Sequence, residues 1–361
     1  MQREQEKKYI HAFNCTRKAG AQGLAKLSAH FSSLADAWRA PAAELVRAGL
    51  TQENAQMVAD GRRSIDVEAF WEKFTASGIA LVARHDAEYP KLLRTIIDAP
   101  YALYIRGTLP KDDEKLIAIV GTRKPTAYGK EAARYLAREL VRAGFSVVSG
   151  MAIGLDAVAL GAALEENGQA YGVLGCGVDV PYPAQNQPLA RRVVEHGALI
   201  SEFAPGVEGE LFHFPMRNRI IAGMSLGTLV IEAREKSGTL ITADLALDYN
   251  RDVFAVPGPM FSQVSRGTHK LIQNGAKLVQ GVRDILETYG LEIVDIRKSL
   301  AEHATPDEQS VLAAISDMPM HLDEIIRATS LPVHAVHSAL TMLEIKGAVE
   351  HVGSSVYGPK R

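Results

Sequence analysis

The sequence contains little cysteine and has no excess of positive charge. Cys15 and Cys176 are the only two cysteines among 361 residues, too few for a disulfide framework and without the spacing of a zinc site. We therefore expect buried free thiols and no bound metal. The 40 lysines and arginines are matched by 42 aspartates and glutamates, so the net charge of −2 gives no general attraction to nucleic acid. Anion binding must therefore depend on local placement of cations.

Long apolar runs are also missing. The longest ones have the length of strands and not of membrane helices. The charged N-terminus MQREQEKKYI has no apolar core of a signal peptide, so we expect a cytoplasmic protein. The 47% apolar and 23% charged residues are typical of globular domains, and the length predicts two or three of them.

Local patterns divide the chain into three domains. Residues 1–85 contain helix-favouring runs separated by glycine and proline, which predicts a small helical domain of the SAM or helix-hairpin-helix type. Its stretch RKAGAQGLAKL suits either a phosphate-contacting hairpin or a plain turn. Residues 86–113 are interrupted by prolines and predict a lead-in linker to a central domain that ends at residue 290. A polar joint precedes residues 304–361, whose order of three helices and a hairpin predicts a winged helix.

The central domain contains apolar, β-branched runs that alternate with helical patterns. Such alternation predicts an α/β fold with a doubly wound parallel sheet covered by helices on both faces. Ligands of these sheets bind at the carboxyl ends of the strands. We expect strands at residues 115–121, 145–150, 170–175, 198–203, 227–233, 252–258 and 276–279.

The first candidate site follows the first of these runs. In VGTRKPTAYG (120–129), Gly121 makes a turn, Thr122 and Arg123 follow, and a helix begins soon after. The motif fits neither a dinucleotide fingerprint nor a Walker A loop. A glycine turn, a capping threonine, free helix amides and a cation together predict an anion cradle, although a plain strand-to-helix turn would have the same residues.

A second cradle is predicted in VIEAREKSGTLITADLA (230–246). Here Lys236, Ser237, Gly238 and Thr239 open a helix directly after a strand, which supplies a cation, two hydroxyls and helix amides. Loops that follow two neighbouring strands of a doubly wound sheet converge. The two cradles therefore predict a groove for several successive phosphates.

Two further motifs leave alternatives open. In SGMAIGLDAVAL (149–160), Asp156 is a possible base, but an acid in the first turn of a helix is more often a cap. In LFHFPMRNRIIAGMS (211–225), Arg217 and Arg219 either face one groove or one of them pairs with Glu202 inside the fold. We find no nucleophile elbow, HExxH motif or Cys–His pair, so we expect neither catalysis nor a cofactor.

Taken together, these motifs resemble the DprA/Smf family of DNA-processing proteins, whose core is Rossmann-like. FPMRNRIIAG together with EAREKSGTLITA is highly specific. The resemblance implies a dimeric single-stranded DNA-binding protein that protects incoming DNA and helps to load the RecA recombinase during natural transformation. It also implies the DNA-contacting positions Gly121, Thr122, Arg123, Gly150, Arg217, Asn218, Lys236, Ser237, Gly238 and Thr239.

Three positions depart from the family pattern. Ile153 stands where the family has arginine, Leu160 where it has histidine, and His269 where it usually has asparagine. If the arginine contacts DNA in relatives, this protein binds DNA more weakly or differently at Ile153.

Two other functions are compatible with the fold. One is a nucleotide-phosphate-binding hydrolase that resembles the phosphoribohydrolase group, although KSGTLITAD lacks the acid pattern of those enzymes. The other is a duplex-DNA regulator that acts through the winged helix. Its candidate recognition helix, VHAVHSALTMLEIKG, contains no arginine, so we expect this domain to contact protein.

Overall fold

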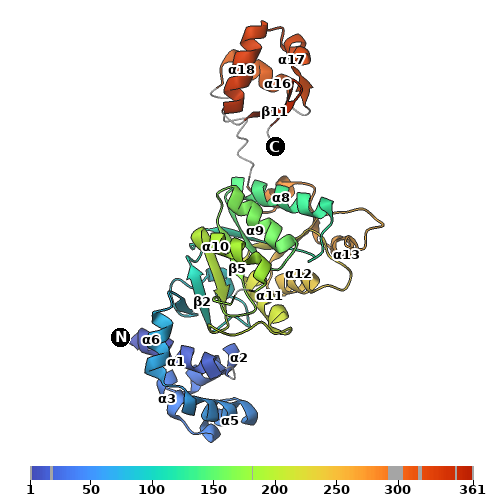
Figure 1. The fold of residues 1–361 in the computed structure, drawn as a ribbon. Helices are drawn as coiled ribbons and strands as arrows, with labels where there is room; N and C mark the ends of the chain where they lie inside the picture. The colour runs from blue at the N-terminus through green and yellow to red at the C-terminus, as the bar shows by residue number, and fades with distance from the viewer. Residues whose placement is uncertain are drawn as a thin grey trace. The chain divides into compact units, whose positions relative to one another are not determined.

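Strands alternate with helices in the central part of the chain and form the α/β sheet that the sequence predicts (Figure 1). The computed structural model describes residues 2–16, 19–180, 182–291, 304–315, 319–345 and 348–359. The chain divides into two units, residues 1–289 and 290–361. Residues 292–303, which include most of the expected polar joint, lie outside the described residues. No helix in the described ranges is long and apolar enough to cross a membrane.

The sheet of the first unit has nine strands in the order β1-β2-β6-β5-β4-β3-β7-β8-β9. All neighbours from β6 to β9 pair in parallel, as predicted, and every one of the seven expected runs contains a strand. The strands are β1 Ala80–Ala83, β2 Ala102–Gly107, β3 Lys115–Val120, β4 Phe145–Ser149, β5 Ala170–Val173, β6 Gly197–Ser201, β7 Gly227–Val230, β8 Asp252–Ala255 and β9 Lys277–Leu278.

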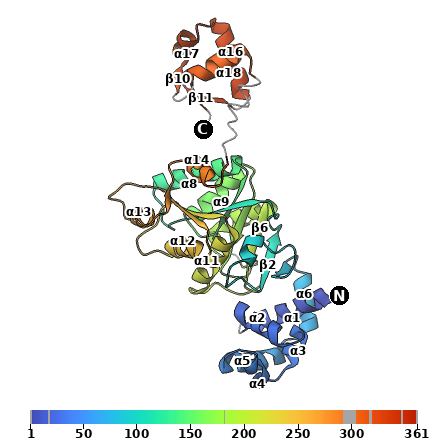
Figure 2. The same ribbon diagram turned by 180° about the vertical axis from the view of Figure 1, so that it is seen from behind.

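Helices cover both faces of this sheet (Figures 1 and 2). Helices α8, α9 and α10 pack together on one face, and α11 and α12 pack together on the other. The chain winds from β3 toward β6 and then returns to β7 beside β3, so the sheet has its switch point between β3 and β7. The helices are α7 Lys91–Arg94, α8 Ala127–Arg142, α9 Leu155–Glu165, η2 Ala184–Asn186, α10 Gln187–Glu195, α11 His213–Met224, α12 Gly238–Asp248, α13 Arg266–Gln273 and α14 Val282–Thr288.

The segment expected as a linker contributes a strand to the sheet. Strand β2 pairs antiparallel with β6, and β1, from the segment expected to be helical, pairs antiparallel with β2. The prolines flank β2 and do not interrupt it. At its end, Gly107 has a φ of +108°, and a Cβ there would lie 2.2 Å from the carbonyl oxygen of Gly197. The close pairing with β6 therefore requires glycine, which the sequence pattern alone did not reveal.

The N-terminal residues are helical, as the sequence predicts, and belong to the same unit as the sheet. The first helix packs against the edge of the sheet, where the side chains of His11 and Asn14 contact the hydroxyl of buried Tyr104 at 3.1 and 3.2 Å. An ion pair of 2.7 Å joins Lys7 to Asp86. The elements are α1 Gln2–Thr16, α2 Gly20–His30, α3 Leu34–Arg39, α4 Ala42–Arg47, α5 Gln52–Gly61, η1 Arg62–Ser64 and α6 Val67–Thr75.

The second unit has the predicted order of a winged helix. Ser330 ends its second helix in the left-handed conformation, with a φ of +54°, and so makes the turn before the third helix. A short strand that the sequence did not reveal completes a sheet of the order β10-β12-β11. The elements are α16 Pro306–Ala314, β10 Met320–His321, α17 Leu322–Thr329, α18 Val333–Ile345, β11 Val349–Gly353 and β12 Val356–Pro359.

His11 makes the docking of the helical domain dependent on pH. Burial lowers the pKa of His11 from 6.5 to about 4. The unfolded chain therefore takes up the proton first, and stability that is present above pH 6.5 is lost as the pH falls toward 4. Between pH 7 and pH 5 we expect the free energy of unfolding to decrease by about 2 kcal/mol more in the wild type than in His11→Gln. Urea titrations at several pH values measure this difference, and parallel profiles of the two proteins would contradict it.

Candidate nucleic-acid interface

The loops after β3 and β7 meet at the switch point of the sheet and line a cavity of about 360 Å³. Loops from elements far apart in the sequence therefore converge as expected. Eight of the ten predicted positions line this cavity: Gly121, Thr122, Arg123, Arg217, Asn218, Ser237, Gly238 and Thr239. Gly150 lines a neighbouring cavity of about 450 Å³, to which Arg123 and Arg217 also contribute. We call the two cavities together the groove.

The helix start at the first motif differs from the expectation of free amides. Thr126 caps α8 by accepting a hydrogen bond from the amide of Gly129 at 3.0 Å. The backbone amide and the hydroxyl of Thr126 in turn donate to the buried carboxylate of Glu232, at the end of β7. A Cβ at Gly129 would lie 2.2 Å from this carboxylate. The chain thus supplies its own anion to this helix start, and Arg123 and Lys124 remain as exposed cations of the loop.

Arg217 is buried in the wall of the groove and is not free for a ligand. Its guanidinium donates to the carbonyl of Gly150 at 2.6 Å and to that of Val173, and so connects the ends of β4 and β5. Burial lowers the pKa of Arg217 to about 10, while nearby Asp156 opposes this shift. The group is therefore still charged at neutral pH.

Asp156 binds a backbone amide of the loop after β4 and lies within the electrostatic influence of Arg217. Its carboxylate accepts the amide of Gly150 at 3.1 Å, and burial raises its pKa although Arg217 lowers it. A Cβ at Gly150 would lie 2.6 Å from both side chains, so this position requires glycine. Asp156 thus holds a loop amide that precedes α9 and does not cap the helix, whose N-cap Gly154 has no side-chain hydrogen bond. A base at this position would first have to give up these buried contacts.

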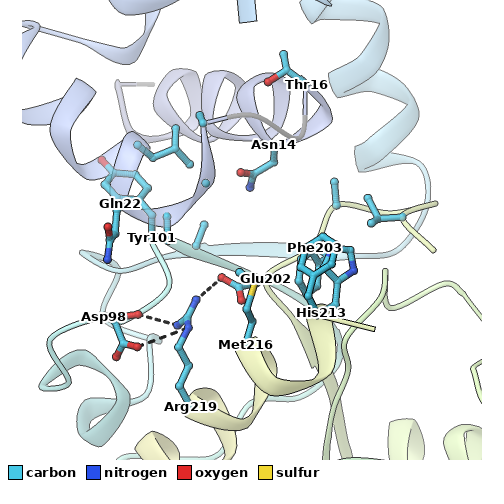
Figure 3. Close-up of a pocket in the computed structure, with 18 of the residues that line it drawn as sticks. Asn14, Thr16, Gln22, Asp98, Tyr101, Glu202, Phe203, His213, Met216 and Arg219 are labelled. Atoms are coloured by element: carbon cyan, nitrogen blue, oxygen red, sulfur yellow. Dashed lines mark hydrogen bonds and ion pairs between the residues drawn. The ribbon is translucent and has the colours of Figure 1, made fainter. Parts of the chain in front are cut away.

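The second arginine of the motif pairs inside the fold. Arg219 donates to the carboxylate of Glu202 and, at 2.7 Å, to the carbonyl of Asp98 (Figure 3). Burial raises the pKa of Glu202, and Arg219 opposes the shift. Of the two arrangements that the sequence left open, pairing with Glu202 is the one present, and Arg219 does not line the groove.

Aromatic rings line the neighbouring cavity. The rings of Tyr182 and Phe214 are stacked, with centroids 5.2 Å apart, and the guanidinium of Arg123 lies 5.7 Å from the centre of the Phe214 ring. Ile153 lines the same cavity and is 43% exposed. The cavity therefore offers a stacking surface and one cation beside an apolar side chain, a combination suited to a base and its phosphate.

The second motif contributes a capped helix and exposed cations. Ser237 caps α12 by accepting the amide of Thr239 at 3.1 Å. Lys236 is exposed but lines neither cavity, whereas Arg234 lines the cavity at the switch point. Sequence reasoning missed Arg234, although it lies in the same loop and follows the end of β7 by a few residues.

The described residues contain no group of three or more His, Cys, Asp or Glu side chains that could hold a metal ion.

Family models match most of the chain. The model described as DNA recombination-mediator protein A matches residues 80–290, and the DprA winged helix domain matches residues 297–353. The chain belongs to the DprA/Smf family. The first match begins at β1, which supports assigning both antiparallel edge strands to the core.

Individual relatives agree with this assignment. The chain is 33% identical to Protein Smf of Synechocystis sp. over 95% of its own length and 96% of that protein. It is 41% identical to DNA processing protein DprA of Bacillus subtilis over 62% and 77% of the two chains. The crystal structure of DprA from Streptococcus pneumoniae matches with a TM-score of 0.62 and 35% identity, over 68% of this chain and 86% of that one.

A second related structure concerns binding to DNA. DprA from Helicobacter pylori, whose structure addresses its single-stranded DNA-binding mode, matches with a TM-score of 0.53 and 29% identity, over 58% of this chain and 95% of that one.

Two of the three departures from the family pattern lie away from the two cavities. Leu160 is fully buried, and His269 lies 3.0 Å from the carbonyl of Gly258. Ile153 is the departure that faces the groove.

Replacing Arg217 tests its structural role. Arg217→Ala leaves Asp156 as a buried charge without its partner, so we expect the free energy of unfolding to fall by about 3–5 kcal/mol. Urea denaturation followed by circular dichroism measures the change. Arg123→Ala, which removes an exposed guanidinium, is the matched control and should leave stability unchanged. A fully stable Arg217→Ala protein would show that this side chain does not hold β4 and β5 together.

Proposed function

We propose that this protein binds single-stranded DNA without catalysis, protects it, and helps to load the RecA recombinase during natural transformation. The observation that supports binding most directly is the groove at the switch point. It combines the exposed cations Arg123 and Arg234 with the stacked rings of Phe214 and Tyr182. Cations that follow a backbone and rings that stack on bases are the usual elements of sequence-tolerant binding to single strands.

Family membership supports the choice of substrate. Single-stranded DNA binding is described for the related protein of Helicobacter pylori, which matches this chain across the core. The proposed site comprises the ten positions predicted from the sequence, with Arg234 in addition. Their roles differ: Gly121 and Gly150 allow close packing, Arg217 and Asn218 shape the wall, and the exposed cations attract phosphate. A homodimer, recombinase loading and a cytoplasmic location are parts of the proposal that depend on the family resemblance.

Removing single cations tests the groove. We expect Arg123→Ala and Arg234→Ala, which each remove an exposed cation from the lining of the groove, to weaken binding to an oligo-dT strand. The slope of log affinity against log salt should become shallower by about 0.7 for each phosphate that the variant no longer neutralises. Fluorescence anisotropy at several salt concentrations gives both values. The control is Arg138→Ala on α8, because Arg138 pairs with Glu165 and lines neither cavity.

The outcomes of this experiment are distinct. Unchanged affinity in both cation variants would contradict the groove as the DNA site. Tighter binding to duplex than to single strand would favour a duplex regulator that acts through the winged helix. Turnover of a nucleoside monophosphate would favour the hydrolase.

Restoring the family's arginine tests the departure at Ile153. Ile153 is 43% exposed in the wall of the cavity that holds the stacked rings. Ile153→Arg places a further cation there, so we expect tighter binding to oligo-dT and a salt slope that is steeper by about 0.7. Ile153→Gln, which adds polarity without charge, is the control. If Ile153→Gln tightens binding to oligo-dT as much as Ile153→Arg does, the added charge is not the cause of the tighter binding.

A further inference from the structure

A separate cavity of about 670 Å³ lies between the N-terminal helices and the core (Figure 3). The first turn of α2 and the end of α1 form one wall, and the start of α11 with the segment after β6 forms the other. Thus both walls belong to the first unit. None of the ten predicted DNA-contacting positions lines this cavity.

Aromatic side chains make one wall of this cavity. The rings of Phe203 and His213 lie with their centroids 4.0 Å apart, at an angle of 31°, and Phe212 contacts His213 edge-on at 4.5 Å. Phe212 is 59% exposed, and the adjacent Leu211, which lines the groove, is 89% exposed. This pair is an exposed apolar crest between the cavity and the groove.

Unused polar groups face the same space. His213 is only 7% exposed, and its Nδ1 accepts the amide of Glu210 at 3.3 Å, which leaves the proton of the neutral ring on Nε2. This Nε2 has no hydrogen-bond partner among the described residues. One carboxylate oxygen of Glu202, Oε1, is likewise buried without a partner in the described part of the chain. Helix α2 begins at Gly20, and its N-cap residue Ala19 makes no side-chain hydrogen bond to the first turn. A buried acceptor such as Glu202 Oε1 is costly when it is left unpaired, and a bound polar molecule with a donor would satisfy it.

Charge limits what the cavity accepts. Among the described residues that line it, Asp98, Glu202 and Glu210 are acidic, and the arginine, Arg219, is already paired with the first two. An anionic phosphate is therefore disfavoured inside, whereas a neutral flat ring with hydrogen-bonding edges is compatible with both the aromatic wall and the polar groups.

We propose that this cavity receives one unstacked base of the DNA strand that lies in the groove. The first turns of α11 connect the two sites, because His213 and Met216 line the cavity while Phe214, Pro215 and Asn218 line the groove. The phosphates stay with the exposed cations of the groove, and the base passes the crest of Leu211 and Phe212. This inference rests on the proposed binding of single strands and adds a second binding site, which the N-terminal helical domain completes.

Filling the cavity tests the inference without touching the groove. Ala21 lines the cavity from α2 and lies far in the sequence from every predicted DNA contact, so Ala21→Trp blocks the space. Ala25→Trp is the matched control, since Ala25 is exposed on the same helix and does not line the cavity. Met216→Trp fills the cavity from the opposite wall and serves if Ala21→Trp does not fold.

The probe is oligo-dT with a single 2-aminopurine placed at successive positions. Wild type and Ala25→Trp should quench the fluorescence of 2-aminopurine at a cavity position. In Ala21→Trp and Met216→Trp that quenching should disappear, with affinity about tenfold lower, the effect of losing one stacked base.

Three results would overturn the proposal in different ways. If the wild type does not bind the strand, the proposed function itself fails. If it binds and both cavity-filling variants behave like the wild type, only the base site fails. If free 2-aminopurine deoxyribonucleotide is quenched as strongly as the strand, and Ala21→Trp abolishes this quenching, the cavity serves a free nucleotide and not a strand.

Discussion

The buried guanidinium of Arg217 fixes the geometry on which the groove depends. It joins the carbonyl ends of β4 and β5 and balances the charge of Asp156, which in turn holds the amide of Gly150. Gly150 has no room for a side chain because both charged groups pack against it. Two opposite buried charges, each hydrogen-bonded to the backbone of Gly150, therefore set the position of the loop after β4. Such a pair is retained for the arrangement it specifies more than for the stability it adds.

A second internal charge organises the other side of the switch point. The carboxylate of Glu232 reaches from the end of β7 to Thr126 at the start of α8 and joins the two loops that the sequence identified as cradles. Because the protein's own carboxylate occupies this helix start, bound phosphate depends on exposed cations and not on the amides of α8. The anion site that the sequence predicted at this helix start is thus occupied by a carboxylate of the fold itself, and binding of an external anion by the loop stays a prediction.

The parts that sequence reasoning predicted are those encoded by local patterns. Apolar runs gave all seven parallel strands, and glycine positions gave the loops that converge at the switch point. The missed parts depend on contacts distant in sequence. Strand β2 is recognisable only through its pairing with β6, and the burial of Arg217 only through β4 and β5. The exposure of Arg234 and the pairing of Arg219 with Glu202 likewise depend on how the sheet is closed.

The separation of buried, neutralised charges from exposed cations explains how a protein with no net positive charge can favour a polyanion. The buried charges are neutralised within the fold: Arg217 by Asp156, and Arg219 by Glu202 and Asp98. The cations left exposed at the groove include Arg123 and Arg234, and they lie beside a wall whose buried charges are neutralised within the fold. Affinity for phosphates then arises from local cations and is sensitive to salt. Stacking of bases on the neutral rings adds contacts that do not depend on the base sequence. Asp98, Glu202 and Glu210 make the cavity around Arg219 acidic, so in the proposed arrangement the phosphates stay on the groove side of the Leu211–Phe212 crest.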